Sequence, residues 1–284
     1  MRVGNLGGRF VLLTEDGAVD VAAATNGRLP ADPAEAYDRW DEVVTWATAL
    51  DPADLGPVVT KEVDLHTVGA PSPRPRQVFA LALNYADHAG EVGAAAPAAP
   101  SVFTKFATSL TGPSGAIALP SGAVDWEVEL VVVIGRPARH VAAADAWAHV
   151  AGVTVGQDLS ERAVQFADAT PQFSLAKSFP GFSPTGPWLV TPDELADPDD
   201  LALGCAVNGE TVQSARTSEM VFPVPAIVAH LSSVLTLLPG DLIFTGTPAG
   251  VGALRHPPRF LAPGDELTTW VTGVGEMAHR LVAP

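Results

Sequence analysis

The stretch Asp125-Trp126-Glu127-Val128-Glu129-Leu130, which runs on through apolar residues to Gly135, decides how the rest of the sequence is interpreted. Side chains two positions apart point to the same face of an extended strand, so Glu127 and Glu129 present two carboxylates side by side. Such carboxylates repel each other unless a cation neutralises them. A site made only of oxygen atoms favours Mg²⁺, Mn²⁺ or Ca²⁺ over Zn²⁺. The alternative is a half-exposed strand with a polar outer face.

The composition indicates a folded protein that avoids anionic partners. Its 284 residues are 47% hydrophobic, and the 32 acidic against 16 basic residues give a net charge of -16, which argues against nucleic acid and anionic membranes. The single cysteine, Cys205, cannot form an internal disulfide, and the N-terminus lacks the apolar core of a signal peptide. The apolar run Leu130 to Ile134 is too short to span a bilayer and predicts a buried strand. We therefore expect a cytoplasmic protein.

The chain is predicted to contain two domains, with residues 1–70 as a small α/β domain and residues 71–284 as the larger one. The boundary falls at Gly69 to Arg76, because this proline-rich segment cannot continue a helix or a central strand. Before it, Arg9 to Thr14 has the pattern of a strand and Asp38 to Leu50 that of a helix. After it, many short β-branched runs alternate with Gly and Pro turns, which predicts an α+β, mostly β fold.

Asp158 is a candidate third carboxylate ligand. It ends the strand-like run Val153 to Asp158. An aspartate in this position can also cap a following helix, since its side chain accepts hydrogen bonds from the first free amides. The local sequence leaves both interpretations open.

His88 and Glu91 form a candidate acid–base pair. They are three residues apart, so in a helical turn they lie on one face, and the carboxylate orients the imidazole and raises its basicity. A solvated surface pair is the alternative.

Lysine usage marks two further positions. The chain has 13 Arg but only three Lys, so Lys105 and Lys177 could serve where a compact point charge is needed. Both could instead be ordinary surface lysines.

The segment Thr245 to Gly252 is a glycine-rich loop that follows the strand-like run Leu242 to Phe244. Its amides and hydroxyls could hold a substrate carboxylate, and the alternative is a plain turn that closes a hairpin. The sequence has neither a P-loop nor a dinucleotide-binding glycine motif, so nucleotide binding is not indicated.

Read in order, several segments across about residues 78–280 resemble the fumarylacetoacetate hydrolase family, in particular its acylpyruvase and 2-hydroxyhepta-2,4-diene-1,7-dioate isomerase-like branch. They are NYADHAGE, TKF, DWEVELVVVIGR, GQDLSER, LAKSF, GPWLVT, VNGE and LIFTGTPAGVG. The resemblance implies a mixed β-sandwich roll that forms a homodimer and binds Mg²⁺ or Mn²⁺. The implied metal ligands are Glu127, Glu129 and Asp158, the catalytic residues are His88, Glu91 and Lys177, and the substrate-binding residues are Lys105, Arg162, Gln165 and Thr247. Arg162 and Gln165 rest on the resemblance alone.

The implied activity is metal-dependent hydrolysis of a carbon–carbon bond in a small 2,4-dioxo acid of the acylpyruvate or fumarylpyruvate type. His88, oriented by Glu91, would activate the water. A decarboxylase, isomerase or hydratase acting on a 2-oxo acid through the same metal-enolate chemistry is the alternative. An alternative of another class is a catalytically silent metal-binding dimer, against which the presence of both His88 and Glu91 argues.

Two positions depart from the family pattern. Asn84 stands where some relatives place an aspartate ligand, so the cation is expected to keep an additional water. Ser160-Glu161-Arg162-Ala163 replaces the Ser/Thr-Ala-Arg-Asp of many relatives, which leaves the substrate choice carried by that turn open.

Overall fold

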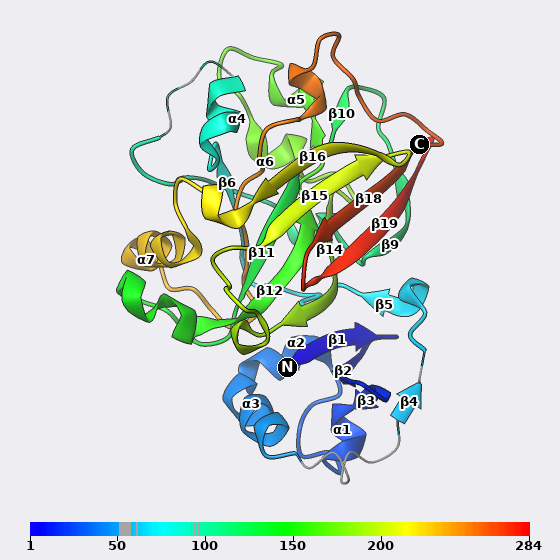
Figure 1. Ribbon diagram of the computed structural model, residues 1–284, viewed down its shortest axis with the longest axis vertical. Helices are drawn as coiled ribbons and strands as arrows, with labels where there is room; N and C mark the ends of the chain where they lie inside the picture. Colours follow the sequence, from blue (N-terminus) through cyan, green and yellow to red (C-terminus); the bar gives the residue numbers. More distant parts are fainter. Residues whose placement is uncertain (51–57, 61, 92, 94, 96) are drawn as a thin grey trace.

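The computed structural model describes residues 1–50, 58–60, 62–91, 93, 95 and 97–284. Short helices surround a core of β-sheets in this part of the chain (Figure 1). None of the described helices is long and apolar enough to cross a bilayer. The α-helices are α1 (Val21–Ala24), α2 (Pro33–Asp38), α3 (Trp40–Thr48), α4 (Ala86–Glu91), α5 (Arg162–Gln165), α6 (Phe173–Ala176) and α7 (Val224–Val234).

The strands are short, as the frequent Gly and Pro turns of the sequence predicted. In chain order they are β1 (Arg2–Leu6), β2 (Arg9–Thr14), β3 (Gly17–Asp20), β4 (Val58–Thr60), β5 (Val68–Gly69), β6 (Val78–Ala82), β7 (Ser101–Thr104), β8 (Leu110–Thr111), β9 (Ser114–Ala118), β10 (Val124–Asp125), β11 (Val128–Ile134), β12 (Val150–Gln157), β13 (Ser160–Glu161), β14 (Ser183–Val190), β15 (Ala202–Val207), β16 (Glu210–Arg216), β17 (Leu242–Phe244), β18 (Glu266–Val271) and β19 (Gly275–Val282).

Two sheets pack face to face and enclose the main core. Among the described residues, the large sheet has the order β4-β3-β2-β1-β14-β12-β11-β17-β6-β7, with β5 and β8 attached at β1 and β14. The smaller sheet has the order β16-β15-β18-β19-β9 and lies across β11, β12 and β14 (Figure 1). Side chains of both sheets, among them Val132, Val153 and Leu203, meet in one apolar cluster. This sandwich confirms the predicted α+β, mostly β fold.

Strand β11 occupies the centre of the large sheet and begins within the quoted stretch, at Val128, so that Glu127 directly precedes it. It pairs with β12 on one side and with β17 on the other, and all seven of its residues are buried. A strand covered on both faces reads as an unbroken apolar run, which is why Leu130 to Ile134 predicted it correctly. The pairing of Val128 with Gln157 places the end of β12 beside the start of β11. Asp158 therefore lies next to Glu127, and its backbone N–H donates to the Glu127 carbonyl at 2.9 Å.

The N-terminal segment joins the same large sheet, because β1 pairs antiparallel with β14. The strand predicted at Arg9 to Thr14 is present as β2. The helix predicted over Asp38 to Leu50 is present as α3 and is two residues shorter at each end. The sequence did not predict α2, which precedes it and ends before Arg39, where φ is -123° and ψ is 27°. The domain boundary at residue 70 stays a prediction.

Candidate metal and substrate site

Three buried carboxylates come together where β11 begins and β12 ends. Glu127, Glu129 and Asp158 each offer an oxygen, and these oxygens lie within 4.8 Å of one another. Burial of both glutamates shows that the half-exposed strand is the wrong interpretation of this stretch. The capping role considered for Asp158 is also wrong, because Glu161 caps α5 by accepting from the N–H groups of Ala163 and Val164.

Glu129 has an environment that suits a cation. Burial raises the pKa of its carboxyl well above the ordinary value, and the charges of Asp158 and Glu127 add to this effect. Its Oε2 accepts from the Gly246 N–H at 2.7 Å, whereas its buried Oε1 has no hydrogen-bond partner among the described residues. An unpartnered carboxylate oxygen beside two further carboxylates fits a divalent cation with oxygen ligands, such as Mg²⁺ or Mn²⁺.

Two buried lysines contact the acidic cluster. Lys177 Nζ lies 2.7 Å from Glu127 Oε2 and 2.8 Å from Asp158 Oδ2, and it also donates to Ser160 Oγ at 2.8 Å. Lys105 Nζ contacts the other oxygen of Asp158. Burial opposes protonation of Lys177, but the charges of Asp158 and Glu127 raise its pKa above the ordinary value. With 3% and 4% of Lys177 and Lys105 exposed, the surface interpretation of these lysines is wrong.

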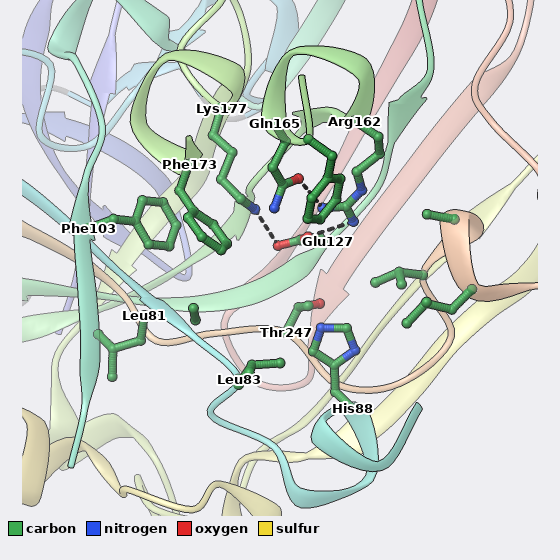
Figure 2. A pocket seen from close by; sticks show the side chains of 15 residues that line it. Leu81, Leu83, His88, Phe103, Glu127, Arg162, Gln165, Phe173, Lys177 and Thr247 are labelled. Carbon is green, nitrogen blue, oxygen red and sulfur yellow. Dashed lines mark hydrogen bonds and ion pairs between the residues drawn. The ribbon is translucent and has the colours of Figure 1, made fainter. Parts of the chain in front are cut away.

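A cavity of about 230 Å³ opens in front of the cluster. Pockets for drug-sized ligands usually measure about 300–1,000 Å³, so this cavity suits a small metabolite. Figure 2 shows Lys177, Gln165 and Arg162 on one side, with Glu127 in the middle and Thr247 and His88 opposite them. Apolar side chains complete the lining, among them Leu81, Leu83, Phe103, Phe173, Val251 and Leu254.

The residues predicted from the sequence divide into two groups around this cavity. Six of them line it, namely His88, Glu127, Arg162, Gln165, Lys177 and Thr247. The remaining four contact members of the first group or of the acidic cluster, namely Glu91, Lys105, Glu129 and Asp158. The structure thus brings all ten predicted residues to one place, and their individual roles stay predictions.

His88 and Glu91 lie on α4 at the edge of the cavity. His88 Nδ1 is 3.2 Å from Glu91 Oε2, and the Glu91 carboxylate also accepts from the Gly250 N–H at 3.0 and 3.2 Å. An ionised carboxylate only accepts hydrogen bonds, so His88 donates from Nδ1, and in a neutral ring Nε2 then carries the lone pair. The surface interpretation is wrong for His88, which is buried and lines the cavity, whereas Glu91 is exposed.

The glycine-rich loop connects the parts of the site. Its Gly246 N–H donates to Glu129, Thr247 Oγ1 accepts from Gln213 Nε2 at 2.9 Å, and its Gly250 N–H reaches Glu91. Gly246 has φ of 95°, and a Cβ there would lie 2.7 Å from Asn84 Cβ, so this position requires glycine. The strand before the loop, β17, pairs with β11 and β6, whereas the next strand, β18, belongs to the smaller sheet. The loop therefore does not close a hairpin.

Three residues shape the site through contacts that were not predicted from the sequence. Asp125 binds Arg162, and the alternation of Asp125, Glu127 and Glu129 was a visible signal for it. Gln213 holds Thr247 from a distant strand, and nothing in the local sequence marked it. Asn84 Oδ1 accepts from the Phe222 N–H and its Nδ2 donates to the Thr245 carbonyl, so Asn84 anchors the glycine-rich loop. The additional water expected from Asn84 stays a prediction.

The arrangement defines a class of protein. A buried cluster of oxygen ligands sits at one side of a small cavity, with cationic side chains next to it and an imidazole opposite. These features are typical of an enzyme that uses a divalent cation on a small anionic substrate.

Comparison with known proteins assigns the family. Residues 77–282 match the model of the fumarylacetoacetate hydrolase C-terminal domain, and the chain belongs to this family. The human protein named oxaloacetate tautomerase FAHD2A, mitochondrial, is 46% identical over 215 residues, which cover 75% of this chain and 68% of that protein.

Solved structures of related proteins support the same family. A crystal structure from Mycobacterium smegmatis, provisionally assigned as an HpcE protein, has a TM-score of 0.94 and 55% identity, covering 100% of this chain and 99% of that one. Maleylpyruvate hydrolase from Sphingobium sp. SYK-6, in complex with manganese(II) and pyruvate, has a TM-score of 0.81 and 29% identity, covering 100% and 98%. The family resemblance inferred from the sequence is thereby confirmed, and the chain is an enzyme of a metal-dependent family.

Proposed function

We propose that this chain interconverts the keto and enol forms of a small 2-oxo acid, with a divalent cation as cofactor and His88 as the acid–base group. The observation that carries the proposal is the His88 ring, fixed by Glu91 and facing Glu127 across the cavity. The relative named as an oxaloacetate tautomerase supports this reaction, which belongs to the isomerase alternative of the sequence analysis.

The side chains have separable roles in this reaction. A cation held by Glu127, Glu129 and Asp158 would supply Lewis acidity towards the carboxylate and carbonyl oxygens of the substrate. His88 Nε2 takes a proton from the carbon beside the carbonyl, and Glu91 stabilises the imidazolium that forms. The imidazolium returns its proton to the enolate oxygen, so no net proton is consumed.

Lys177 and Arg162 bind the anionic end of the substrate in this proposal. Both line the cavity, and both contact Glu127, so their positive charges lie where the carboxylate and the developing enolate charge would be. Lys105, Gln165 and Thr247 complete the binding site around them.

Hydrolysis of a 2,4-dioxo acid is the second candidate. In that reaction His88 takes the proton from a water that attacks the distal carbonyl. The structural similarity to a maleylpyruvate hydrolase favours it, although at a lower identity than the tautomerase relative. The catalytically silent dimer loses support, because the named relatives are enzymes.

A substrate panel tests the proposal. Oxaloacetate, acetylpyruvate and fumarylpyruvate are assayed with Mg²⁺, with Mn²⁺ and after chelation, following enol absorbance, pyruvate and CO₂ separately. We expect faster keto–enol equilibration of oxaloacetate without release of pyruvate or CO₂, and only when metal is present. Cleavage of a 2,4-dioxo acid without tautomerisation would establish the second candidate instead. Turnover that persists unchanged after chelation would contradict both reactions.

The proposal includes a homodimer located in the cytoplasm, with a small 2-oxo acid as its partner and neither nucleic acid nor membrane. The human relative is mitochondrial by name, so its location differs from the cytoplasmic location proposed for this chain. Light scattering during gel filtration measures the dimer directly, and a mass of 29.3 kDa for the particle would rule it out.

A further inference from the structure

Asp125 is a buried carboxylate outside the group of metal ligands, at the end of β10. Its Oδ2 accepts from Arg162 Nε at 2.9 Å, from Arg162 Nη2 at 2.7 Å and from the Ala253 N–H at 3.0 Å. Its Oδ1 accepts from the N–H groups of Gly252 and Trp126 at 2.7 and 2.8 Å. One side chain thus connects the arginine of the cavity to the segment that forms part of the cavity wall.

Arg162 is held by three side chains. Besides its two bonds to Asp125, its Nη2 lies 2.7 Å from Glu127 Oε1, and its Nη1 donates to Gln165 Oε1 at 2.8 Å. Burial opposes ionisation of Glu127, but the charges of Lys177 and Arg162 lower its pKa to about 2. A guanidinium has five N–H groups in a fixed plane, so these contacts leave one N–H on Nη1 without an acceptor among the described residues.

We infer that Asp125 is a positioning residue for substrate binding. It fixes the plane of the Arg162 guanidinium, so that Nη2 stays on Glu127 while the remaining Nη1–H is available to a substrate oxygen in the cavity. Through Gly252 and Ala253 it also holds the part of the cavity wall next to Arg162. The inference rests on the proposed binding of a 2-oxo acid carboxylate by Arg162.

The first test replaces one acceptor of Asp125. Asp125→Asn keeps the size of the side chain but turns one oxygen into an N–H₂ group that faces donors. We expect pyruvate binding to the Mn²⁺-loaded protein to weaken about tenfold by calorimetry, and KM for the preferred substrate to rise while kcat changes little. The affinity for Mn²⁺ itself should change less than about threefold. Unchanged pyruvate binding and KM would overturn the inference.

Asp241→Asn is the matched control. Asp241 is equally buried and accepts from the backbone N–H and side chain of Gln77 and from the Leu238 N–H, away from the cavity. This variant should lower the unfolding temperature without changing pyruvate binding. If Asp241→Asn weakens pyruvate binding as much as Asp125→Asn does, a general loss of stability explains both and the inference fails.

A double-mutant cycle shows whether Asp125 acts through Arg162. If it does, Asp125→Asn combined with Arg162→Ala binds pyruvate no more weakly than Arg162→Ala alone. Effects that multiply would overturn the inference.

Arg162→Lys keeps the charge but not the planar contact with Asp125, so it should reproduce the tenfold loss even if the Asp125 variant does not fold. Wild-type affinity in Arg162→Lys would also overturn it.

A crystal structure of Asp125→Asn separates this inference from the proposed function. If the wild-type protein binds no pyruvate and turns over no 2-oxo acid, the proposed function fails by itself. The position of the Arg162 guanidinium then remains decisive: displacement from Glu127 and Gln165 supports the positioning role, and an unchanged position overturns it.

Discussion

His88→Ala is expected to slow turnover of the preferred 2-oxo acid by about two to four orders of magnitude, the usual contribution of a general acid–base group. The affinity for Mn²⁺ should stay unchanged, because His88 is not part of the carboxylate cluster. Steady-state kinetics and calorimetric titration of Mn²⁺ into the same preparation measure the two quantities. Catalysis and metal binding should thus respond independently.

Two further variants serve as controls for His88. Glu91→Gln keeps an oxygen that can accept from the His88 ring and from Gly250 but loses the charge, so we expect a smaller loss of activity than in His88→Ala. His230→Ala, on α7, should leave activity unchanged. Wild-type rates in His88→Ala would remove the acid–base role. A loss confined to cleavage of 2,4-dioxo acids, with tautomerisation intact, would favour the hydrolytic candidate.

Glu129→Gln is expected to weaken Mn²⁺ binding by about a hundredfold or more. The change removes one negative charge from a buried cluster of three carboxylates. Unit charges about 4 Å apart interact by about 4 kcal/mol at an effective dielectric constant of 20, whereas a hundredfold change corresponds to about 2.8 kcal/mol. Calorimetry with Mn²⁺ measures the effect, and a titration identical to the wild type would contradict the assignment of Glu129 as a ligand.

Glu127→Gln is the matched variant, because the two glutamates should differ in metal-free protein. The pKa of Glu129 is raised, so its contribution to stability is lost as pH rises through that pKa, and Glu129→Gln should unfold at or above the wild-type temperature at pH 7–8. The pKa of Glu127 is lowered to about 2, so its contribution persists at neutral pH and disappears only as pH falls towards 2. The free energy of unfolding of Glu127→Gln should therefore be about 1–3 kcal/mol lower than that of the wild type, as expected when a charged hydrogen-bonding partner is removed. Thermal unfolding with chelator measures both, and equal destabilisation would contradict the different environments.

The sequence by itself determined the class of fold and the family, and it marked the candidate residues. The apolar run Leu130 to Ile134 predicted a buried strand, and β11 has this form because both of its faces are covered. The acids before the run left a half-exposed strand open, and only Glu129 of the two glutamates lies within β11. The order of short motifs identified the family, and the turns predicted a mostly β fold. These inferences succeed because residue type and periodicity act within a few positions along the chain.

Only the tertiary structure decided which groups meet and in which state of burial. Lys105 reaches Asp158 across 53 positions and Glu91 reaches the Gly250 amide across 159, distances over which the sequence contains no pairing signal. In the sequence, Asp125 is one more acid of an alternating pattern. In the structure, its carboxylate accepts from five N–H donors. A carboxylate can bind a metal, cap a helix or hold an arginine with equal local propensity. The choice follows from which donors the packed sheets bring within about 3 Å, because hydrogen bonds weaken steeply beyond that distance.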